Sequence, residues 1–203
     1  DPTDFPPLAV TVDLVLMTVT NGGLAVLLQR RGEAPHKGDW ALPGGFVRVD
    51  ESLDAAAGRI LADKAGLADA WLEQLYSFGD PGRDPRMRIV TIAYFALLPH
   101  RELAAALGGR GDLTLTPIGT DGSARPLAFD HEDIIDHAIK RLRGKLDHSP
   151  VAFALLPPRF TLRALQDVHE AILGVRLNKP AFRRRMLDRG WIEGTGEREE
   201  GGA

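Results

Sequence analysis

The segment GFVRVDESLDAAAGRILADKAGL, residues 45–67, is the most informative part of this chain. Its pattern predicts a helix that ends at Gly66, a residue that readily adopts the left-handed conformation found after helices. Residues at i, i+3 and i+4 lie on one face of a helix. Ile60, Asp63 and Lys64 have this spacing, so an aliphatic side chain, a short carboxylate and a cation share that face.

The same segment resembles the Nudix box, in which a glycine, a glutamate and Arg-Glu-apolar-x-Glu-Glu-x-Gly-apolar stand at fixed spacings. The frame of the box is matched by Gly45, Glu51, Arg59, Leu61, Gly66 and Leu67. Ile60, Asp63 and Lys64 occupy the three positions that the Nudix family fills with glutamate. The resemblance therefore covers the frame of the motif but not its acidic residues.

The missing glutamates bear directly on catalysis. Magnesium needs several oxygen ligands, and the bound cation polarises the pyrophosphate that a Nudix enzyme cleaves. The ammonium group of Lys64 opposes a dication at this place. An alternative is that Asp50, Glu51 and Asp54 supply the ligands. We expect no metal site, no required cofactor and no catalytic residue, so the chain is predicted not to be an enzyme.

Composition bounds the class of protein. The chain has 203 residues, of which 44% are hydrophobic, enough for one domain of ordinary size and a smaller one. It has no cysteine, which excludes disulfides and thiolate metal sites. No apolar run of about 18 residues and no signal-peptide pattern is visible. We therefore expect a cytoplasmic protein that does not bind membranes.

Strand periodicity is clear near the start of the chain. In residues 10–19, Val10 and Val12 alternate with Thr11 and Asp13. The Asn-Gly-Gly at 21–23 is typical of a hairpin turn. The further strands that we expect are 24–30, 41–42, 76–78, 89–98 and 113–117. With the Nudix resemblance, these elements imply an α/β (α+β) fold, the Nudix α/β/α sandwich.

Helix caps and breaks divide the rest of the chain. Asp50 or Ser52 is expected to cap the box helix, and Asp130 to cap a later helix. The buried stripe of that later helix is predicted to be Ile134, Ile135, Ala138, Ile139 and Leu142. His131 and His137 are interpreted as solvated or capping residues, not metal ligands. The prolines of residues 149–158 predict a connector between domains at 1–148 and 159–203.

The loop GDPGRDPRMR, residues 79–88, holds more arginine than a turn requires. Arginine forks match phosphate oxygens bidentately, so such a loop beside a Nudix groove indicates pyrophosphate recognition. The alternative is a solvated loop whose Asp80, Asp84 and arginines pair with one another. The effector-binding residues that we expect are Arg30, Arg31, Lys37, Trp40, Arg83, Asp84, Arg86 and Arg88.

Charge is unevenly distributed. The whole chain has a net charge of -3, but in residues 159–192 eight Lys or Arg residues stand against three acidic ones. Thr161 can cap one helix in this segment and Asn178 a second, with Pro180 in its first turn. Trp191 and the glycines after it complete the order of a winged helix-turn-helix. A basic module of this kind favours DNA binding.

Helical spacing assigns roles within the second helix of this module. Phe182, Met186 and Leu187 are predicted to be its buried side, which directs Arg184 and Arg185 outward and leaves Arg183 near the edge. Arg184 is the expected base contact, and Arg185, Lys179 and Arg176 suit phosphates. The DNA-binding residues that we expect are Thr161, Arg163, Arg176, Asn178, Lys179, Arg183, Arg184 and Arg185. The alternative is that the three arginines only solvate the helix.

From end to end, the chain resembles the Nudix-related transcriptional regulators of NAD metabolism. The matching blocks are TVDLVL, RRGEAPHKGDWALPGGFV, QLYSFGDPGRDPR, LAFDHEDI, LPPRFTLRAL and NKPAFRRRML. The resemblance implies a homodimeric repressor that binds double-stranded, palindromic operator DNA near genes for NAD synthesis or salvage. Its effector would be ADP-ribose or a related nucleotide. The alternatives are an active ADP-ribose pyrophosphatase with a regulatory domain, and a nucleotide-sensing scaffold whose terminal module binds protein.

Overall fold

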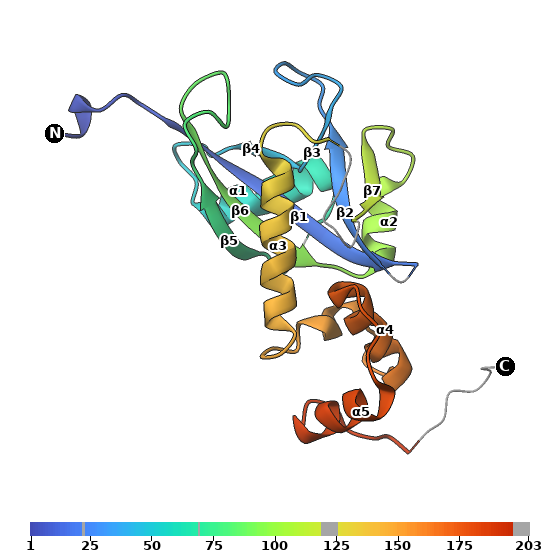
Figure 1. Ribbon diagram of the computed structural model, residues 1–203. Helices are drawn as coiled ribbons and strands as arrows, with labels where there is room; N and C mark the ends of the chain where they lie inside the picture. Colours follow the sequence, from blue (N-terminus) through green and yellow to red (C-terminus); the bar gives the residue numbers. More distant parts are fainter. Residues whose placement is uncertain (22, 69, 119–125, 197–203) are drawn as a thin grey trace.

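The computed structural model describes residues 1–203 except 22, 69, 119–125 and 197–203. Its centre is a 7-stranded mixed sheet in the order β3-β2-β1-β6-β5, with β4 paired to β1 and β7 to β2 (Figure 1). β1 runs parallel to β6, and the other pairs are antiparallel. The strands are β1 (Ala9–Thr20), β2 (Gly23–Arg30), β3 (Trp40–Ala41), β4 (Gly44–Phe46), β5 (Glu73–Phe78), β6 (Ile89–Leu97) and β7 (Leu113–Pro117).

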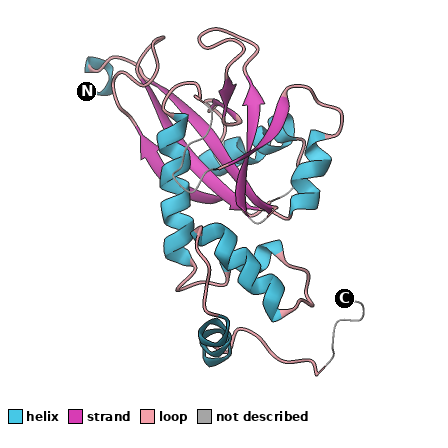
Figure 2. Ribbon diagram, turned by 45° about the vertical axis from the view of Figure 1, so that its right-hand side comes forward, coloured by secondary structure: helices cyan, strands magenta, loops and turns pink. Residues whose placement is uncertain are grey.

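Both faces of the sheet are covered by helices, which is why β1 is buried along most of its length (Figure 2). On one face, Val12, Leu14 and Leu16 pack against α1 (Leu53–Ile60) and α2 (His100–Leu107). On the other face, Val15 and Met17 pack against α3 (His131–Lys145). This arrangement confirms the predicted α/β/α sandwich.

The predicted box helix has the expected ends. Ser52, one of the two expected caps, accepts a hydrogen bond at Oγ from the backbone N–H of Ala55 at 3.1 Å. After α1, the chain continues through a π-helical turn, η2 (Leu61–Ala65), and Gly66 ends it with φ of 68°. The helix α2 and the three-residue strand β4 were not predicted.

The C-terminal part lies beyond the far end of α3 (Figure 1). It consists of the 3₁₀ turn η3 (Val151–Leu155), α4 (Leu162–Leu173) and α5 (Lys179–Asp188). The predicted connector contains η3, whose Ala152 is buried in the same core cluster as α3. No strand is assigned to residues 191–196, and the last part of the predicted wing, 197–203, lies outside the described residues.

The end of α3 is fastened to both terminal helices. Arg143 donates through Nε to the carbonyl of Ile172 at the end of α4, at 2.9 Å. Arg189, which follows α5, donates through Nη1 to the carbonyl of Leu146 at 3.1 Å and pairs with Asp147 at 3.4 Å. None of the helices in the described residues is long and apolar enough to cross a membrane.

Candidate functional site

A cleft of about 530 Å³ opens between β1, β2, β4, the loop after β5 and the start of α3. The predicted residues that line it are Arg30, Arg31, Arg83, Asp84 and Arg86. Lys37, Trp40 and Arg88 lie outside its lining, because Lys37 is exposed on a turn and Trp40 packs against the core. The Arg88 Nη1 donates to the carbonyl of Gly79 at 2.5 Å.

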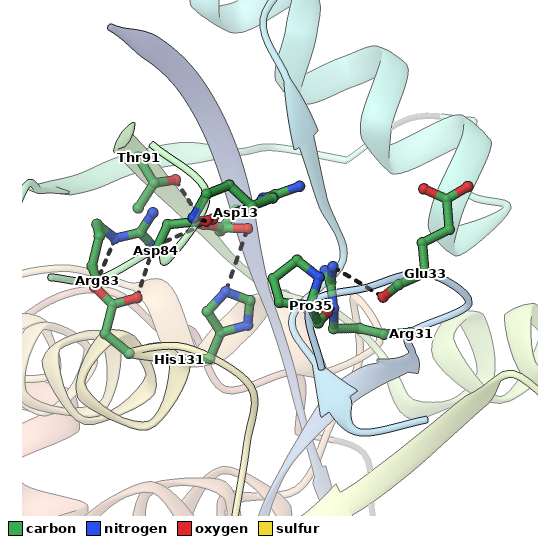
Figure 3. A network of polar contacts seen from close by, with 10 residues as sticks. Asp13, Arg31, Glu33, Pro35, Arg83, Asp84, Thr91 and His131 are labelled. Atoms are coloured by element: carbon green, nitrogen blue, oxygen red, sulfur yellow. Dashed lines mark hydrogen bonds and ion pairs between the residues drawn. The ribbon is translucent and has the colours of Figure 1, made fainter. Parts of the chain in front are cut away.

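Asp13 of β1 is the centre of the polar floor of this cleft (Figure 3). Its Oδ2 accepts a hydrogen bond from Thr91 Oγ1 at 2.7 Å and lies 3.7 Å from Arg83 Nη2. The backbone of β4 passes so close that a Cβ at Gly44 would lie 2.0 Å from Asp13 Oδ1. Asp13 was not among the predicted site residues, although a carboxylate that alternates with apolar residues in a strand was a signal for it.

Arg83 is held in place by a carboxylate. Its Nε and Nη2 donate to the two oxygens of Asp130 at 2.8 and 2.7 Å. Asp130 does occupy the N-cap position of α3, as predicted, but its side chain makes no capping hydrogen bond and instead binds an arginine 47 residues away. Burial alone would lower the pKa of Arg83, but the hydrogen bonds to Asp130 leave it above the ordinary value.

His131 is neither solvated nor capping, which corrects the sequence interpretation. It is 4% exposed, its Nδ1 accepts the backbone N–H of Leu42 at 2.8 Å, and its Nε2 lies 3.8 Å from Asp13 Oδ1. Burial lowers the pKa of His131, so the imidazole is held in its neutral form. His137 is half-buried and stacks on Tyr76, with ring centroids 4.8 Å apart.

The loop arginines are partly paired within the loop, as the alternative interpretation expected. Arg86 donates to both oxygens of Asp84, at 3.0 and 2.7 Å, and the hydrogen bond to Asp84 raises the pKa of Arg86. The guanidinium carbon of Arg86 lies 5.3 Å from the ring centroid of Phe46 and 5.9 Å from that of Phe129. Arg86 thus adds an aromatic-flanked cation to the cleft while Asp84 balances its charge.

Arg31 has a different environment from Arg83 and Arg86. Its guanidinium lies 4.7 Å from the ring centroid of Phe129 and donates to the carbonyls of Pro35 and Glu33 at 2.8 and 3.5 Å. Burial, followed by repulsion from Arg86, lowers the pKa of Arg31. Phe129 holds a positive φ of 58°, a strained conformation for a non-glycine residue. The cleft therefore presents a cation whose contacts are neutral carbonyls and an aromatic face.

The box helix places no carboxylate cage beside these groups. Ile60 is 1% exposed and packs beneath Gly45 as part of the core. Both oxygens of Glu51 accept from Arg59, whose hydrogen bond lowers the Glu51 pKa to about 2, and Asp54 accepts from the hydroxyl of Tyr94 at 2.7 Å. Within the described residues, no group of three or more His, Asp or Glu side chains could hold a metal ion.

The terminal helices have the predicted caps. Thr161 Oγ1 accepts from Ala164 N and Asn178 Oδ1 accepts from Ala181 N, each at 3.0 Å. Phe182 and Met186 are buried as expected, but Leu187 is 48% exposed, which corrects its assignment to the buried side.

The predicted DNA-binding side chains differ in their surroundings. Lys179, Arg183 and Arg184 are exposed on α5. Arg185 is exposed as predicted, and it also lies 3.8 Å from Asp147, just after the end of α3. On α4 and the turn after it, Arg163 pairs with Asp167 at 3.0 Å and Arg176 with Glu170 at 2.6 Å.

Both the sheet-containing part and the C-terminal helical part of the chain are similar to known protein families. Residues 7–111 match the NUDIX domain, and residues 152–203 match the NrtR DNA-binding winged helix domain. The sequence is 40% identical over 194 residues to the ADPR responsive transcriptional repressor NtrR of Acinetobacter baylyi, covering 95% of this chain and 77% of that protein.

Two crystal structures are similar. One is Shewanella oneidensis NrtR complexed with a 27mer DNA, with a TM-score of 0.82, 38% identity and coverage of 95% of this chain and 89% of that one. The other is the NUDIX domain of the same NrtR complexed with ADP ribose, with a TM-score of 0.59 and 36% identity over 70% of this chain and 93% of that one.

Proposed function

Because the chain belongs to the NrtR family of Nudix-related transcriptional regulators, we propose that it is a nucleotide-responsive repressor of genes for NAD synthesis or salvage. The observation that carries the proposal is a cleft rich in arginine, without a carboxylate cage, joined by α3 to a basic helix-turn-helix. The effector is ADP-ribose or a related NAD-derived nucleotide, which the cleft binds without cleaving.

Effector binding is assigned first to Arg31. Its contacts are carbonyl oxygens, so a diphosphate gives its guanidinium the ionic partner that it lacks in those contacts. Arg30 lines the same cleft and is held by the carbonyl of Gly38 at 3.1 Å. Arg83 and Arg86 already bind Asp130 and Asp84, so they are assigned to the support of the cleft's shape.

DNA binding is assigned to the exposed arginines of α5. Arg184 lies on the solvent side, between the buried Phe182 and Met186, and is the proposed base contact. Lys179 and Arg183 suit phosphates, which fix the position of a protein on DNA. In a homodimer, two such helices would reach half-sites about 34–36 Å apart or at multiples of that spacing.

The test is a mobility-shift titration of a fragment upstream of a candidate NAD gene, with ADP-ribose added with and without magnesium while AMP release is measured. A retarded band that responds to intact ADP-ribose supports a sensor and regulator. Arg184→Ala is expected to weaken DNA binding at least several-fold and to retain nucleotide binding. Arg31→Met is expected to weaken nucleotide binding and to retain DNA binding. AMP release without a DNA shift would make the chain an ADP-ribose pyrophosphatase instead.

A further inference from the structure

The turn between α4 and α5 is held by two buried polar side chains of α4. Glu170 Oε1 accepts from the backbone N–H of Leu177 at 3.0 Å and from Gln166 Nε2 at 2.7 Å. The Nε2 of Gln166 also donates to the carbonyl of Leu177 at 3.0 Å. Gln166 and Glu170 are 4% and 8% exposed. The backbone N–H and the carbonyl of Leu177 are therefore both bound by buried side chains. We call Gln166 and Glu170 the clasp.

The negative charge of Glu170 is unfavourable at this position for two reasons, and its hydrogen bonds must offset that cost. Glu170 lies in the last turn of α4, where the helix dipole disfavours a negative charge. It also adds negative charge to a domain proposed to approach DNA phosphates. Hydrogen bonds from Leu177, Gln166 and Arg176 lower the pKa of Glu170 to about 2, so the group stays ionised.

The position of the clasp connects it to DNA recognition. Leu177 immediately precedes Asn178, the residue that caps α5, so a fixed Leu177 fixes the point at which α5 begins. The other carboxylate oxygen, Oε2, accepts from Arg176 Nη1 at 2.6 Å, although the Arg176 side chain is 84% exposed. One buried carboxylate thus orients both the start of α5 and a cation on the surface beside it.

We propose that Glu170 is a positioning residue for DNA recognition, which sets the direction of α5 so that Arg184 meets its base. The inference rests on the proposed function and adds a residue that does not touch DNA. The expected effect of removing Glu170 on DNA affinity is opposite to the effect that its charge alone predicts. Removing an acid from a DNA-binding domain ordinarily tightens binding through phosphate attraction, whereas removing the clasp carboxylate is expected to weaken it.

The experiment compares Glu170→Met with Asp167→Met in the full chain. It measures affinity at several salt concentrations for the promoter fragment that the mobility-shift titration retards, here called the operator, and for random DNA. Both variants remove one negative charge from α4, but Asp167 has a 46% exposed side chain and pairs with Arg163. Glu170→Met is expected to lose about tenfold in operator affinity, the scale of one lost base contact, with little change on random DNA. Asp167→Met is expected to bind both DNAs equally well or more tightly.

Two further variants keep the result interpretable. Gln166→Met removes the other half of the clasp without changing charge and is expected to lower the ratio of operator to random affinity in the same direction. It decides the matter if Glu170→Met does not fold. Arg176→Ala leaves the hydrogen bond between Glu170 and Leu177 intact. It is expected to weaken binding to operator and to random DNA alike, and to reduce the slope of log affinity against log salt concentration by about 1.

Operator binding by Glu170→Met that is as tight as that of the unaltered chain would overturn the inference. So would a parallel loss on operator and random DNA together with a lower melting temperature, because that pattern describes a destabilised domain. Absence of DNA binding by the unaltered chain would instead overturn the proposed function itself.

Discussion

The ion pair between Arg83 and Asp130 leads to a quantitative prediction for Arg83→Met. The Arg83 side chain is 4% exposed and the Asp130 side chain 18%, and two hydrogen bonds of 2.8 and 2.7 Å join them. Removing one partner of a buried pair costs roughly 3–5 kcal/mol, because the other charge is left without compensation. Since water partly reaches Asp130, we expect the lower end, about 3 kcal/mol.

This cost corresponds to a fall in melting temperature of about 6–12 °C, at about 2–4 °C per kcal/mol for a chain of this size. The assay is urea unfolding of the single variants and of Arg83→Met combined with Asp130→Leu. Replacing both Arg83 and Asp130 by apolar groups leaves no unpaired charge at position 130, so the double variant is expected to recover about 2 kcal/mol relative to additivity. Asp13, which lies 3.7 Å from Arg83, loses this cation in the single and the double variant alike.

Arg88→Met is the matched control, because Arg88 is an exposed arginine at the end of the same loop whose Nη1 binds the carbonyl of Gly79. Its cost is expected to be under about 1 kcal/mol. If Arg83→Met costs no more than Arg88→Met, or if the two substitutions at the ion pair are additive, the pair does not hold the cleft together.

Two predictions concern other parts of the cleft. Burial lowers the pKa of His131 in the folded state, so the unfolded chain binds more protons and stability falls as pH drops below about 6.5. His131→Asn keeps an acceptor for Leu42 but does not titrate, so the free energy of unfolding measured against pH should fall less steeply; an unchanged slope would contradict the buried, neutral imidazole. Gly44→Ala should cost about 1–3 kcal/mol in thermal unfolding, because its Cβ would overlap Asp13. Gly58→Ala is the control, since its Cβ meets nothing within 4 Å and alanine favours a helix; equal costs would exclude the overlap.

Local chemistry made the ends of helices predictable from sequence. Ser52, Thr161 and Asn178 each bond a backbone N–H three residues later, and Gly66 adopts the left-handed conformation. Such features depend on neighbours within one turn. The helix α2 was missed because its N-cap is Pro99, which offers no side-chain acceptor as a start signal.

The sequence indicated which kinds of residue line the cleft, but not how those residues pair with one another. Basic residues on two loops indicated an anion site, but their partners depend on contacts between distant parts of the chain. Arg83 meets Asp130 across 47 residues, and Asp13 meets Thr91 across 78. Similarly, Arg185 was expected to point outward from helical spacing alone, and its approach to Asp147 depends on how α5 packs beneath α3. Periodicity assigns a face but does not say what that face meets.

The helix α3 acts mechanically as a strut. Its 15 residues span about 22 Å, with Asp130 and His131 bound into the cleft at one end and Arg143 and Asp147 bound to the terminal helices at the other. Because both ends are fastened, a tilt of about 5° at the cleft carries the opposite end through about 2 Å, a displacement comparable to two-thirds of a hydrogen-bond length. A change in the cleft that tilts α3 would therefore also shift the contacts that its far end makes with α4 and with Arg189 after α5.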